Sequence, residues 1–361
     1  MPPPQLIHIL GIGNLGKLVA HSLRKSHPKT PITLLFHRPA LVEEWNKAGQ
    51  CIELVRDGVS DRQSGFTYES VSEGKSQLQD AVIRNLVVAT KSYATANALQ
   101  SLRGRLIPSS TLLFLQNGIG TIDEVNSSLF NQPSSRPNYL AGIVNHGVYT
   151  TSPFSAVHAG FANTILGPVV GLPAEVQTPK QKEEMAFLTQ QILDAPNLAT
   201  SLVSPAELLY TQLQKLAVNA TINPLTVIFD CFNGELFQST EIRKLMVPLV
   251  HELSTVIRGI IASGQGVNHA IEPKLSDRFS PENLDRIICD VGAKTSKNKS
   301  SMRQDVLGGR KTEIDYINGY IVARATEYGM ECPLNAKLVD LVKNKTLVPK
   351  DDIQKVFGIV D

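Results

Sequence analysis

A row of polar residues with helical spacing is the part of this sequence best suited to chemistry. Lys215, Asn219 and Asn223 follow one another at intervals of four residues, which places them along one face of an α-helix. Most residues between them are apolar, and an apolar helix with one narrow polar row is not a typical surface helix. Because buried polar groups must find partners, the row is expected to line a cavity. Composition alone leaves a solvated helix edge equally open.

A glycine-rich turn near the N-terminus is typical of a dinucleotide site. Residues 11–16 fit G-x-G-x-x-G and stand between the strand-like run Leu6–Leu10 and a segment with helical spacing. The first glycine permits the tight turn, the second lets a pyrophosphate approach the backbone, and the third lets helix and strand pack closely. The helix N-terminus also attracts phosphates. A turn that merely needs glycines is the alternative, but the βαβ context favours a cofactor site. Its residues are Gly11, Ile12, Gly13, Asn14, Leu15 and Gly16.

The residues after the second predicted strand, Ile32–Phe36, bear on the choice of cofactor. An NAD site usually offers Asp or Glu there to the ribose 2′-hydroxyl, whereas this chain has His37 and Arg38. A carboxylate would repel a 2′-phosphate, and a guanidinium can bind one with two hydrogen bonds. We therefore expect NADP (NADPH) as the cofactor, with an ordinary surface arginine as the alternative for Arg38.

Length, composition and charge limit the class of protein. The chain has 361 residues, enough for two domains, and 42% of them are hydrophobic, too many for a disordered protein. Lys plus Arg total 35 and Asp plus Glu total 33, a formal net charge of +2. That balance gives no reason to expect nucleic acid or a membrane surface as a partner.

Cysteine usage and the N-terminus indicate a cytoplasmic protein. Cys51, Cys231, Cys289 and Cys332 are scattered without a CxxC pair, which favours reduced thiols over a disulfide framework or a metal site. The N-terminal segment resembles neither a secretory nor a transit leader. No apolar run approaches the roughly 20 residues that span a bilayer.

The alternation of short apolar runs with helical segments predicts a parallel sheet covered on both faces. A strand-like pattern over 139–168 is expected to extend that sheet, and Trp45 to pack beneath a helix. His146 and His158 fall in this region and its loops with no partner in view. Predicted strands are Leu6–Leu10, Ile32–Phe36, Leu86–Ala89 and Thr111–Leu115, with a helix over Tyr93–Leu102.

The best domain boundary is the loop-like stretch from Pro196 to Pro205, which we divide just before Ser204. Ser204 as N-cap, Pro205 at the first helical position and Glu207 at the third make a good helix start, and the remainder reads as helical. We therefore predict an α/β Rossmann-type domain over 1–203 and an all-α substrate and catalytic domain over 204–361. The active site is expected in the cleft between them. Residues 273–299, rich in Lys, Ser and Asp, are predicted to form an exposed irregular excursion.

The polar row also resembles a known family. Residues 215–226, K-L-A-V-N-A-T-I-N-P-L-T, look like the C-terminal signature of ketopantoate reductases (2-dehydropantoate 2-reductases). Several separated motifs in the right order are more specific than any one of them. The other matching segments are residues 11–16, Thr90-Lys91, Gln116–Gly120, Asn298–Asp305 and Thr312–Gly319.

The resemblance implies a role for individual residues. Lys215 corresponds to the family's general acid, and Glu313 to the glutamate that holds the substrate hydroxyl and the lysine. Arg38 corresponds to the 2′-phosphate ligand. Positions corresponding to substrate-binding residues are Asn219, Asn223, Asn298 and Ser301, and those at the junction of cofactor and substrate are Lys91 and Asn117.

The segment around Glu313 reads as a helix start, with Thr312 as N-cap and Asp315 reaching back. Glu313 would then lie in the first turn, where the helix dipole stabilises its charge; a plain first-turn acid is the alternative. Hydride reduction of a ketone makes an alkoxide, which a desolvated lysine can protonate. A nearby glutamate favours the ammonium form, and the sequence does not decide which effect prevails.

The resemblance implies NADPH-dependent reduction of 2-dehydropantoate to pantoate, in pantothenate and coenzyme A biosynthesis. Two alternatives stay open: a reductase of another branched 2-oxo acid, and a catalytically silent NADPH-binding regulatory protein. The segments 51–76, 127–138 and 273–299 are longer or more polar than a compact member needs, which bears on substrate choice. The partner is a small 2-oxo acid, and a homodimer is compatible with the sequence but not required by it.

Overall fold

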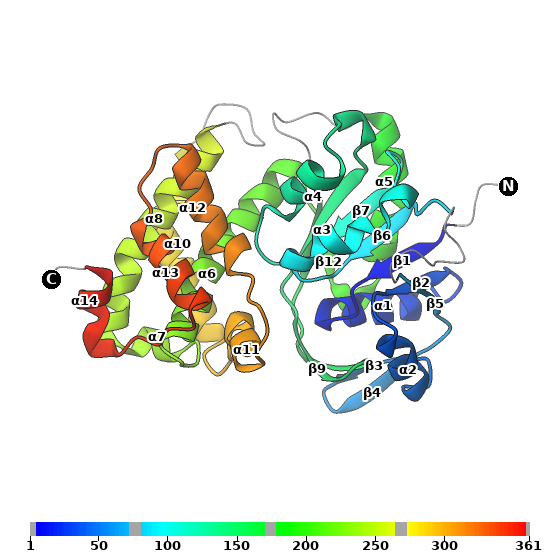
Figure 1. The fold of residues 1–361 in the computed structure, drawn as a ribbon, viewed down its shortest axis with the longest axis horizontal. Helices are drawn as coiled ribbons and strands as arrows, with labels where there is room; N and C mark the ends of the chain where they lie inside the picture. Colours follow the sequence, from blue (N-terminus) through cyan, green and yellow to red (C-terminus); the bar gives the residue numbers. More distant parts are fainter. Residues whose placement is uncertain (1–4, 72–80, 170–177, 264–272, 359–361) are drawn as a thin grey trace. The chain divides into compact units, whose positions relative to one another are not determined.

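The computed structural model describes residues 5–71, 81–169, 178–263 and 273–358. These form two compact units, an N-terminal unit over 5–116, 121–169 and 178–208, and a helical unit over 117–120, 209–263 and 273–358 (Figure 1). The division falls inside helix α6 (Pro205–Ile228). At the start of α6 the Ser204 hydroxyl accepts the backbone N–H of Glu207 at 3.2 Å, as predicted for its N-cap. The predicted fold class, α/β Rossmann-type followed by helical, is confirmed.

The main sheet of the N-terminal unit is parallel over most of its width. From β5 to β8 every neighbouring pair is parallel. At the other edge, β11 runs antiparallel to β8, and β12 runs parallel to β11. The predicted strands all belong to it. In order across the sheet, the strands are β12 (Thr200–Leu202), β11 (Thr164–Val169), β8 (Asn138–Val144), β7 (Thr111–Phe114), β6 (Asn85–Val88), β1 (Ile7–Leu10), β2 (Ile32–Phe36) and β5 (Thr67–Ser70).

Helices cover both faces of this sheet because successive strand residues point to opposite sides. In β6, Val87 packs in one hydrophobic cluster and Leu86 and Val88 in another. The first cluster receives side chains of α1 (Asn14–Ser26) and α5 (Pro179–Leu193), and the second those of α3 (Ser92–Gln100) and α4 (Thr121–Leu129).

A second, smaller sheet lies against α1. Its strands, in order, are β4 (Val59–Gln63), β3 (Ile52–Arg56), β10 (Ser155–Gly160) and β9 (Gly147–Ser152). The prediction that 139–168 extends the main sheet is therefore right for β8 and β11 and wrong for the β9–β10 hairpin. The hairpin is antiparallel and leaves most of β9 exposed, an arrangement that a parallel sheet covered by helices does not offer.

The polar segment 51–76 supplies β3, β4 and β5 rather than a loop, apart from residues 72–76, which lie outside the described residues. Trp45 on α2 (Ala40–Lys47) is fully buried, as predicted. The segment 127–138 holds the end of α4, a short turn at Pro133–Ser135 and the start of β8.

The helical unit is built around α8 (Thr240–Ala262). This helix is long and apolar enough to cross a membrane by length and composition, but its buried residues, such as Leu245 and Leu249, belong to the core of the unit. It packs against α10, α12 and α13. The remaining helices are α7 (Glu235–Gln238), α9 (Pro273–Arg278), α10 (Pro281–Lys294), α11 (Ser301–Leu307), α12 (Asn318–Glu327), α13 (Pro333–Lys343) and α14 (Ile353–Phe357).

The prediction of an irregular excursion over 273–299 is wrong. Most of this segment forms α9 and α10, and Leu284 and Ile288 of α10 are fully buried. Ser280 caps α10 by accepting the N–H of Asn283 at 3.2 Å. Although the segment is mostly polar, it contains an apolar pair at helical spacing, and burial of this pair favours a packed helix.

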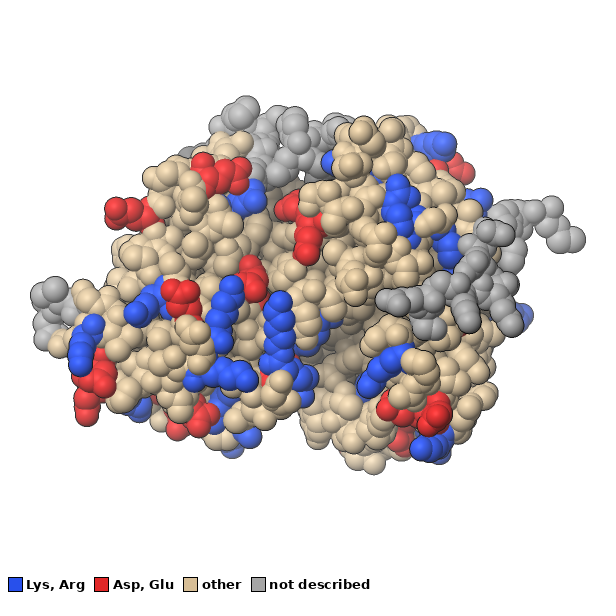
Figure 2. Space-filling view, in the orientation of Figure 1, with Lys and Arg blue, Asp and Glu red and all other residues tan. Residues whose placement is uncertain are grey.

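The visible face of the molecule carries both signs of charge. Figure 2 shows Lys and Arg side chains interspersed with Asp and Glu over this face. All four cysteines lie in described parts of the chain, and none of them forms a disulfide.

Candidate functional site

The glycine turn after β1 is built so tightly that two of its glycines cannot be replaced. Gly11 has φ +94°, and a Cβ there would lie 2.7 Å from the carbonyl carbon of Ala89 and from the nitrogen of Thr90. A Cβ on Gly16 would lie 1.9 Å from the carbonyl oxygen of Gly11. The turn thus sits beside the end of β6, where the strand order of the sheet reverses. This is the usual place of a dinucleotide in such folds.

Gly13, between them, faces open space. A Cβ at this position would meet nothing within 4 Å. Gly13 is the N-cap of α1, which has no side-chain cap and no acidic residue in its first turn. An uncapped helix N-terminus with open backbone fits a pyrophosphate, so the turn formed with Ile12, Asn14 and Leu15 suits the cofactor predicted for it.

Lys17, directly after the turn, was not predicted. It is 1% exposed, and its Nζ donates to Thr150 Oγ1 at 2.7 Å and to the carbonyls of Ser152 and Ser155 at 3.1 and 3.2 Å. Thr150 in turn donates to Asn14 Oδ1 at 2.5 Å. Burial lowers the pKa of Lys17 to about 8. The lysine is enclosed because α1 packs against both sheets, which periodicity within α1 does not reveal.

Arg38 lies where predicted, exposed beyond the end of β2. The structure adds an acid that the sequence analysis missed. Arg38 Nη2 lies 3.8 Å from Glu44 Oε2 on α2. The guanidinium therefore has a competing carboxylate close by, and the neighbourhood is less purely cationic than the residues following β2 indicated.

Lys91 occupies the N-cap of α3, beyond the end of β6. Its carbonyl accepts the Thr95 hydroxyl at 3.0 Å, and Gln116 Nε2 donates to Val88 O at 3.1 Å and to Thr95 at 3.3 Å. These bonds fix the backbone after β6 next to that after β7. Lys91 thus belongs to the same end of the sheet as the glycine turn.

In the helical unit, the predicted polar row lies on one continuous helix, α6. Lys215 and Asn219 are half-buried, and Asn223 is 7% exposed. Around them Leu216 and Ala217 are buried in the core of the unit. The row is therefore a polar stripe on a helix that is otherwise largely enclosed.

Glu313 is buried, and its negative charge affects the pKa of Lys215. Burial lowers the pKa of Lys215 to about 8, and the negative charge of Glu313 works in the opposite direction. Of the two competing effects recognised in the sequence, burial is the larger. A lysine in this state can both hold and release a proton near neutral pH.

The predicted helix start at Thr312 is wrong. Glu313 is the N-cap of a short 3-10 turn, η4 (Ile314–Tyr316), and α12 begins at Asn318. Asp315 does not reach back to cap it; its carboxylate pairs with Lys343 Nζ at 2.5 Å. Contacts made by this turn with distant parts of the chain decide the geometry, and a local motif does not contain them.

The Asn117–Gly120 segment packs against that turn. The N–H of Ile119 donates to the carbonyl of Tyr316 at 2.9 Å. Gly118 has φ +83°, and a Cβ on it would lie 2.2 Å from the same carbonyl oxygen. Only glycine fits there, and the contact brings the loop that carries Asn117 against the turn that follows Glu313.

Ser301 is the first residue of α11, Asn298 lies just before that helix, and both are exposed. The hydroxyl of the intervening Ser300 is shared with Thr226 on α6 at 2.7 Å and accepts the N–H of Arg303 at 3.0 Å. Thr226 follows Asn223 by one turn, so this bond ties the segment that carries both residues to the end of the polar row.

The two histidines that lacked a visible partner contact each other. His158 Nε2 lies 3.0 Å from His146 Nδ1, and His146 Nε2 lies 2.9 Å from the carbonyl of Leu198. Both are buried, and burial lowers the pKa of His158 to about 4. The pair joins the ends of β9 and β10 to a loop near β12, which is a structural role.

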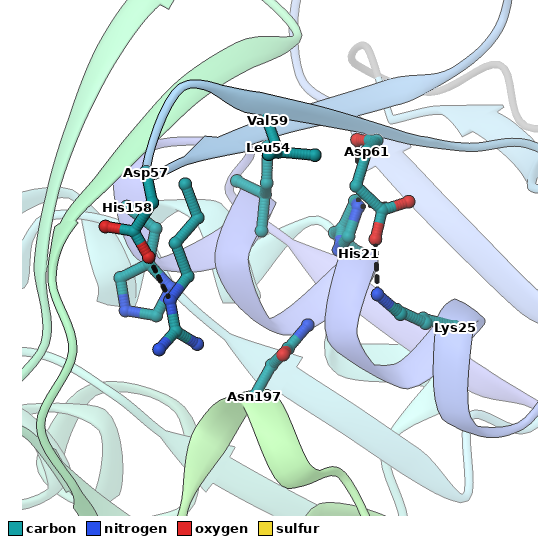
Figure 3. A pocket seen from close by; sticks show the side chains of 9 residues that line it. His21, Lys25, Leu54, Asp57, Val59, Asp61, His158 and Asn197 are labelled. Carbon is teal, nitrogen blue, oxygen red and sulfur yellow. Dashed lines mark hydrogen bonds and ion pairs between the residues drawn. The ribbon is translucent and has the colours of Figure 1, made fainter.

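A pocket of about 280 Å³ in the N-terminal unit does not coincide with any predicted site residue. It lies between the second half of α1 and the β3–β4 hairpin (Figure 3), where Lys25 is bound to Asp61 at 2.6 Å. Within the described ranges, no group of three or more His, Cys, Asp or Glu could hold a metal ion.

Comparison with known proteins gives the family of this site. Residues 7–171 match the family model described as ketopantoate reductase PanE/ApbA, and residues 207–346 match its C-terminal counterpart. The chain belongs to the ketopantoate reductase family. It is therefore an NAD(P)-dependent 2-oxo acid reductase with a Rossmann-type domain.

The relatives of this ketopantoate reductase family member differ in substrate. A probable 2-dehydropantoate 2-reductase of Schizosaccharomyces pombe is 29% identical over 94% of this chain and 96% of its own length. A ketoisovalerate reductase of Gibberella fujikuroi is 30% identical, covering 94% of this chain and 83% of that protein. A solved D-mandelate dehydrogenase with NADH shares the fold, with a TM-score of 0.70 at 20% identity over 97% of this chain and 100% of that one.

Proposed function

We propose that this chain reduces 2-dehydropantoate to pantoate with NADPH, as a step in pantothenate and coenzyme A biosynthesis. The observation that carries the proposal is the pair of Lys215 and the buried Glu313, with a lysine pKa of about 8. The N-terminal unit is assigned to the cofactor and the helical unit to the substrate. The proposal places the enzyme in the cytoplasm, with a homodimer as its assembly.

The cofactor residues are those of the glycine turn, 11–16, together with Arg38 for the 2′-phosphate, Lys91 and Asn117. When bound, the nicotinamide supplies a hydride to the carbonyl carbon of the substrate. Lys215 donates a proton to the oxygen as the alkoxide forms, and its lowered pKa makes the proton easier to release. Asn219, Asn223, Asn298 and Ser301 hold the carboxylate and the hydroxyl of the 2-oxo acid.

The buried carboxylate of Glu313 favours a substrate that carries a hydroxyl group. 2-Dehydropantoate has one and ketoisovalerate does not, and a site built to bind a hydroxyl rejects an analogue that lacks it because its own polar group is left unpaired. Ketoisovalerate remains the second candidate substrate, since a ketoisovalerate reductase is 30% identical over most of this chain. A silent NADPH-binding protein is the alternative of a different class.

The test is NADPH oxidation measured by absorbance with 2-dehydropantoate, ketoisovalerate and other branched 2-oxo acids at matched concentrations. The proposal expects the largest kcat/KM with 2-dehydropantoate, and a Glu313→Gln variant should lose part of that preference. A larger kcat/KM with ketoisovalerate would replace the substrate proposed here. Tight NADPH binding without turnover of any of these acids would favour the silent protein.

A further inference from the structure

Helix α6 contains a proline at the turn that carries the polar row. Pro224 directly follows Asn223. Because proline has no N–H, the carbonyl of Ala220, four residues earlier, loses its helical hydrogen bond. Ala220 is fully buried, so water does not replace that bond, and a buried carbonyl needs a partner from elsewhere in the fold.

Asn318 supplies that partner. Its Nδ2 donates to the carbonyl oxygen of Ala220 at 2.8 Å, and the side chain is fully buried. Asn318 is the first residue of α12 and closes the short segment that begins at Glu313. The hydrogen bond therefore connects the segment that carries Glu313 directly to the turn of α6 between Asn219 and Asn223.

A second hydrogen bond, to Asn335, fixes the orientation of the Asn318 side chain. Its Nδ2 also donates to Asn335 Oδ1 at 3.0 Å, and Asn335 is fully buried as well. Asn335 donates its own Nδ2 and backbone N–H to the Glu252 carboxylate at 2.9 and 3.1 Å. Since Nδ2 of Asn335 is committed to Glu252, its Oδ1 must face Asn318. The chain of bonds runs from α8 through α13 and α12 to α6.

We propose that Asn318 is a positioning residue of the reductase, which sets Glu313 in register with the Lys215–Asn219–Asn223 face of α6 through the carbonyl of Ala220. Asn318 takes no part in the chemistry itself. The assignment rests on the proposed function for what the positioned residues do. The missing N–H of Pro224 is then a feature of the site, because it leaves a carbonyl that a second segment of the active site can bind.

The test compares Asn318→Ala with Ser254→Ala. Ser254 is a matched control: it is buried in α8 of the same unit and donates to the carbonyl of Phe279 at 2.6 Å. Ser254→Ala loses one buried hydrogen bond and Asn318→Ala loses two, so both variants should lower the unfolding midpoint. Asn318→Ala should also lower kcat/KM by about 10- to 100-fold, as expected when reacting groups are slightly misplaced, whereas Ser254→Ala should retain the parent value.

A second readout does not require turnover. Glu313 supports the charged form of Lys215, so moving it away should lower the pKa of that lysine. The pKa is measured by NMR of lysines labelled at Cε, with Lys215→Met to assign the signal. It should fall in Asn318→Ala and stay at the parent value in Ser254→Ala. An unchanged pKa together with parent kcat/KM in a folded Asn318→Ala protein would overturn the proposal.

Restoring the missing N–H gives an independent test. In Pro224→Ala the residue at 224 can donate to the Ala220 carbonyl within the helix, so Asn318 is no longer needed to satisfy it. Stability lost in Asn318→Ala should then be partly recovered in the double variant, while the Lys215 pKa should stay low because Glu313 is still not tied to α6. Recovery of both the stability and the Lys215 pKa in the double variant would show that Asn318 only provides a hydrogen bond to the Ala220 carbonyl.

The measurements also cover two further cases, a variant that does not fold and a parent protein without reductase activity. If Asn318→Ala fails to fold, Asn335→Ala, which leaves the Ala220 contact but removes the group that orients Asn318, should shift the Lys215 pKa in the same direction by less; no shift would contradict the proposal. If the parent protein reduces no 2-oxo acid, the proposed function fails, and the Lys215 pKa still decides whether Asn318 positions Glu313.

Discussion

Burial and the charge of Glu313 have opposite effects on the pKa of Lys215. The resulting pKa of about 8 lies in a range where its effect on catalysis can be measured. A general acid must carry its proton, so kcat should fall as the pH rises through this pKa. Lys215→Met should lower kcat by roughly 10²- to 10⁴-fold, with NADPH binding by calorimetry unchanged. Retention of more than about a third of the parent kcat, when a positioned acid is worth far more, would exclude this role.

Cofactor preference can also be tested with substitutions of single residues, at Arg38 and at Glu44. Arg38→Asp should reduce the preference for NADPH over NADH by about 10- to 100-fold, the worth of a charge-assisted bond. Glu44→Gln should act in the opposite direction and strengthen NADPH binding by about two- to fivefold, since Arg38 is exposed, Glu44 is half-buried and their charged atoms lie 3.8 Å apart. Dissociation constants for both cofactors check this. If Glu44→Gln weakened NADPH binding, Glu44 would be a ligand rather than a competitor.

Residues close in sequence were easier to predict than residues joined by the fold. The spacing of Lys215, Asn219 and Asn223 and the glycine turn are local patterns, and the resemblance supplied Glu313. The roles of Lys17 and Asn318 depend on partners more than 90 residues away in the chain. No pattern around either residue contains those partners, so the sequence alone could not indicate them.

Among the elements, α10 shows how composition can mislead. Its exposed residues are mostly charged, yet Leu284 and Ile288 are fully buried in the core of the helical unit. Apolar runs identified the central strands β1, β2, β6 and β7 of the main sheet because those strands are buried on both faces. The β9–β10 hairpin has a solvent-exposed strand and no such run, which is why its sheet was assigned wrongly.

Burial of α10 can be tested directly. Leu284→Ala should lower the free energy of unfolding by about 2–5 kcal/mol, through lost apolar contact and the cavity left behind. Leu307→Ala is the matched control, because Leu307 is 57% exposed and its truncation should have little effect. Urea denaturation followed by circular dichroism measures both. Equal, small effects would mean that the 273–299 segment is the exposed excursion first expected.

For the whole molecule, the buried ammonium of Lys17 links stability to pH. Its pKa is lowered from 10.5 to about 8 in the folded protein, so between these values the unfolded chain binds more protons and stability rises with pH. Lys17→Met removes this contribution. The variant's unfolding free energy relative to the parent should be most favourable below pH 8 and should decline as the pH approaches 10.5.

Comparing the variant with the parent at each pH cancels the other groups that titrate in this range. Among them are Cys231 and Cys332, whose raised pKa values work against stability at alkaline pH. Thermal or urea unfolding at pH 7, 8, 9 and 10 would suffice. A difference between Lys17→Met and the parent that does not vary with pH would show that Lys17 titrates normally.

The contact between Gly118 and the Tyr316 carbonyl has a consequence for the gene. Every single-base change in a glycine codon that is not silent gives a residue with a Cβ or a stop, and a Cβ at 118 would lie 2.2 Å from that oxygen at φ +83°. No missense allele at this codon should be neutral. Codon 104 is the opposite case, because Gly104 has open space around it and no positive φ. In a population or a saturation library under selection, variation should therefore accumulate at codon 104 and be purged at codon 118.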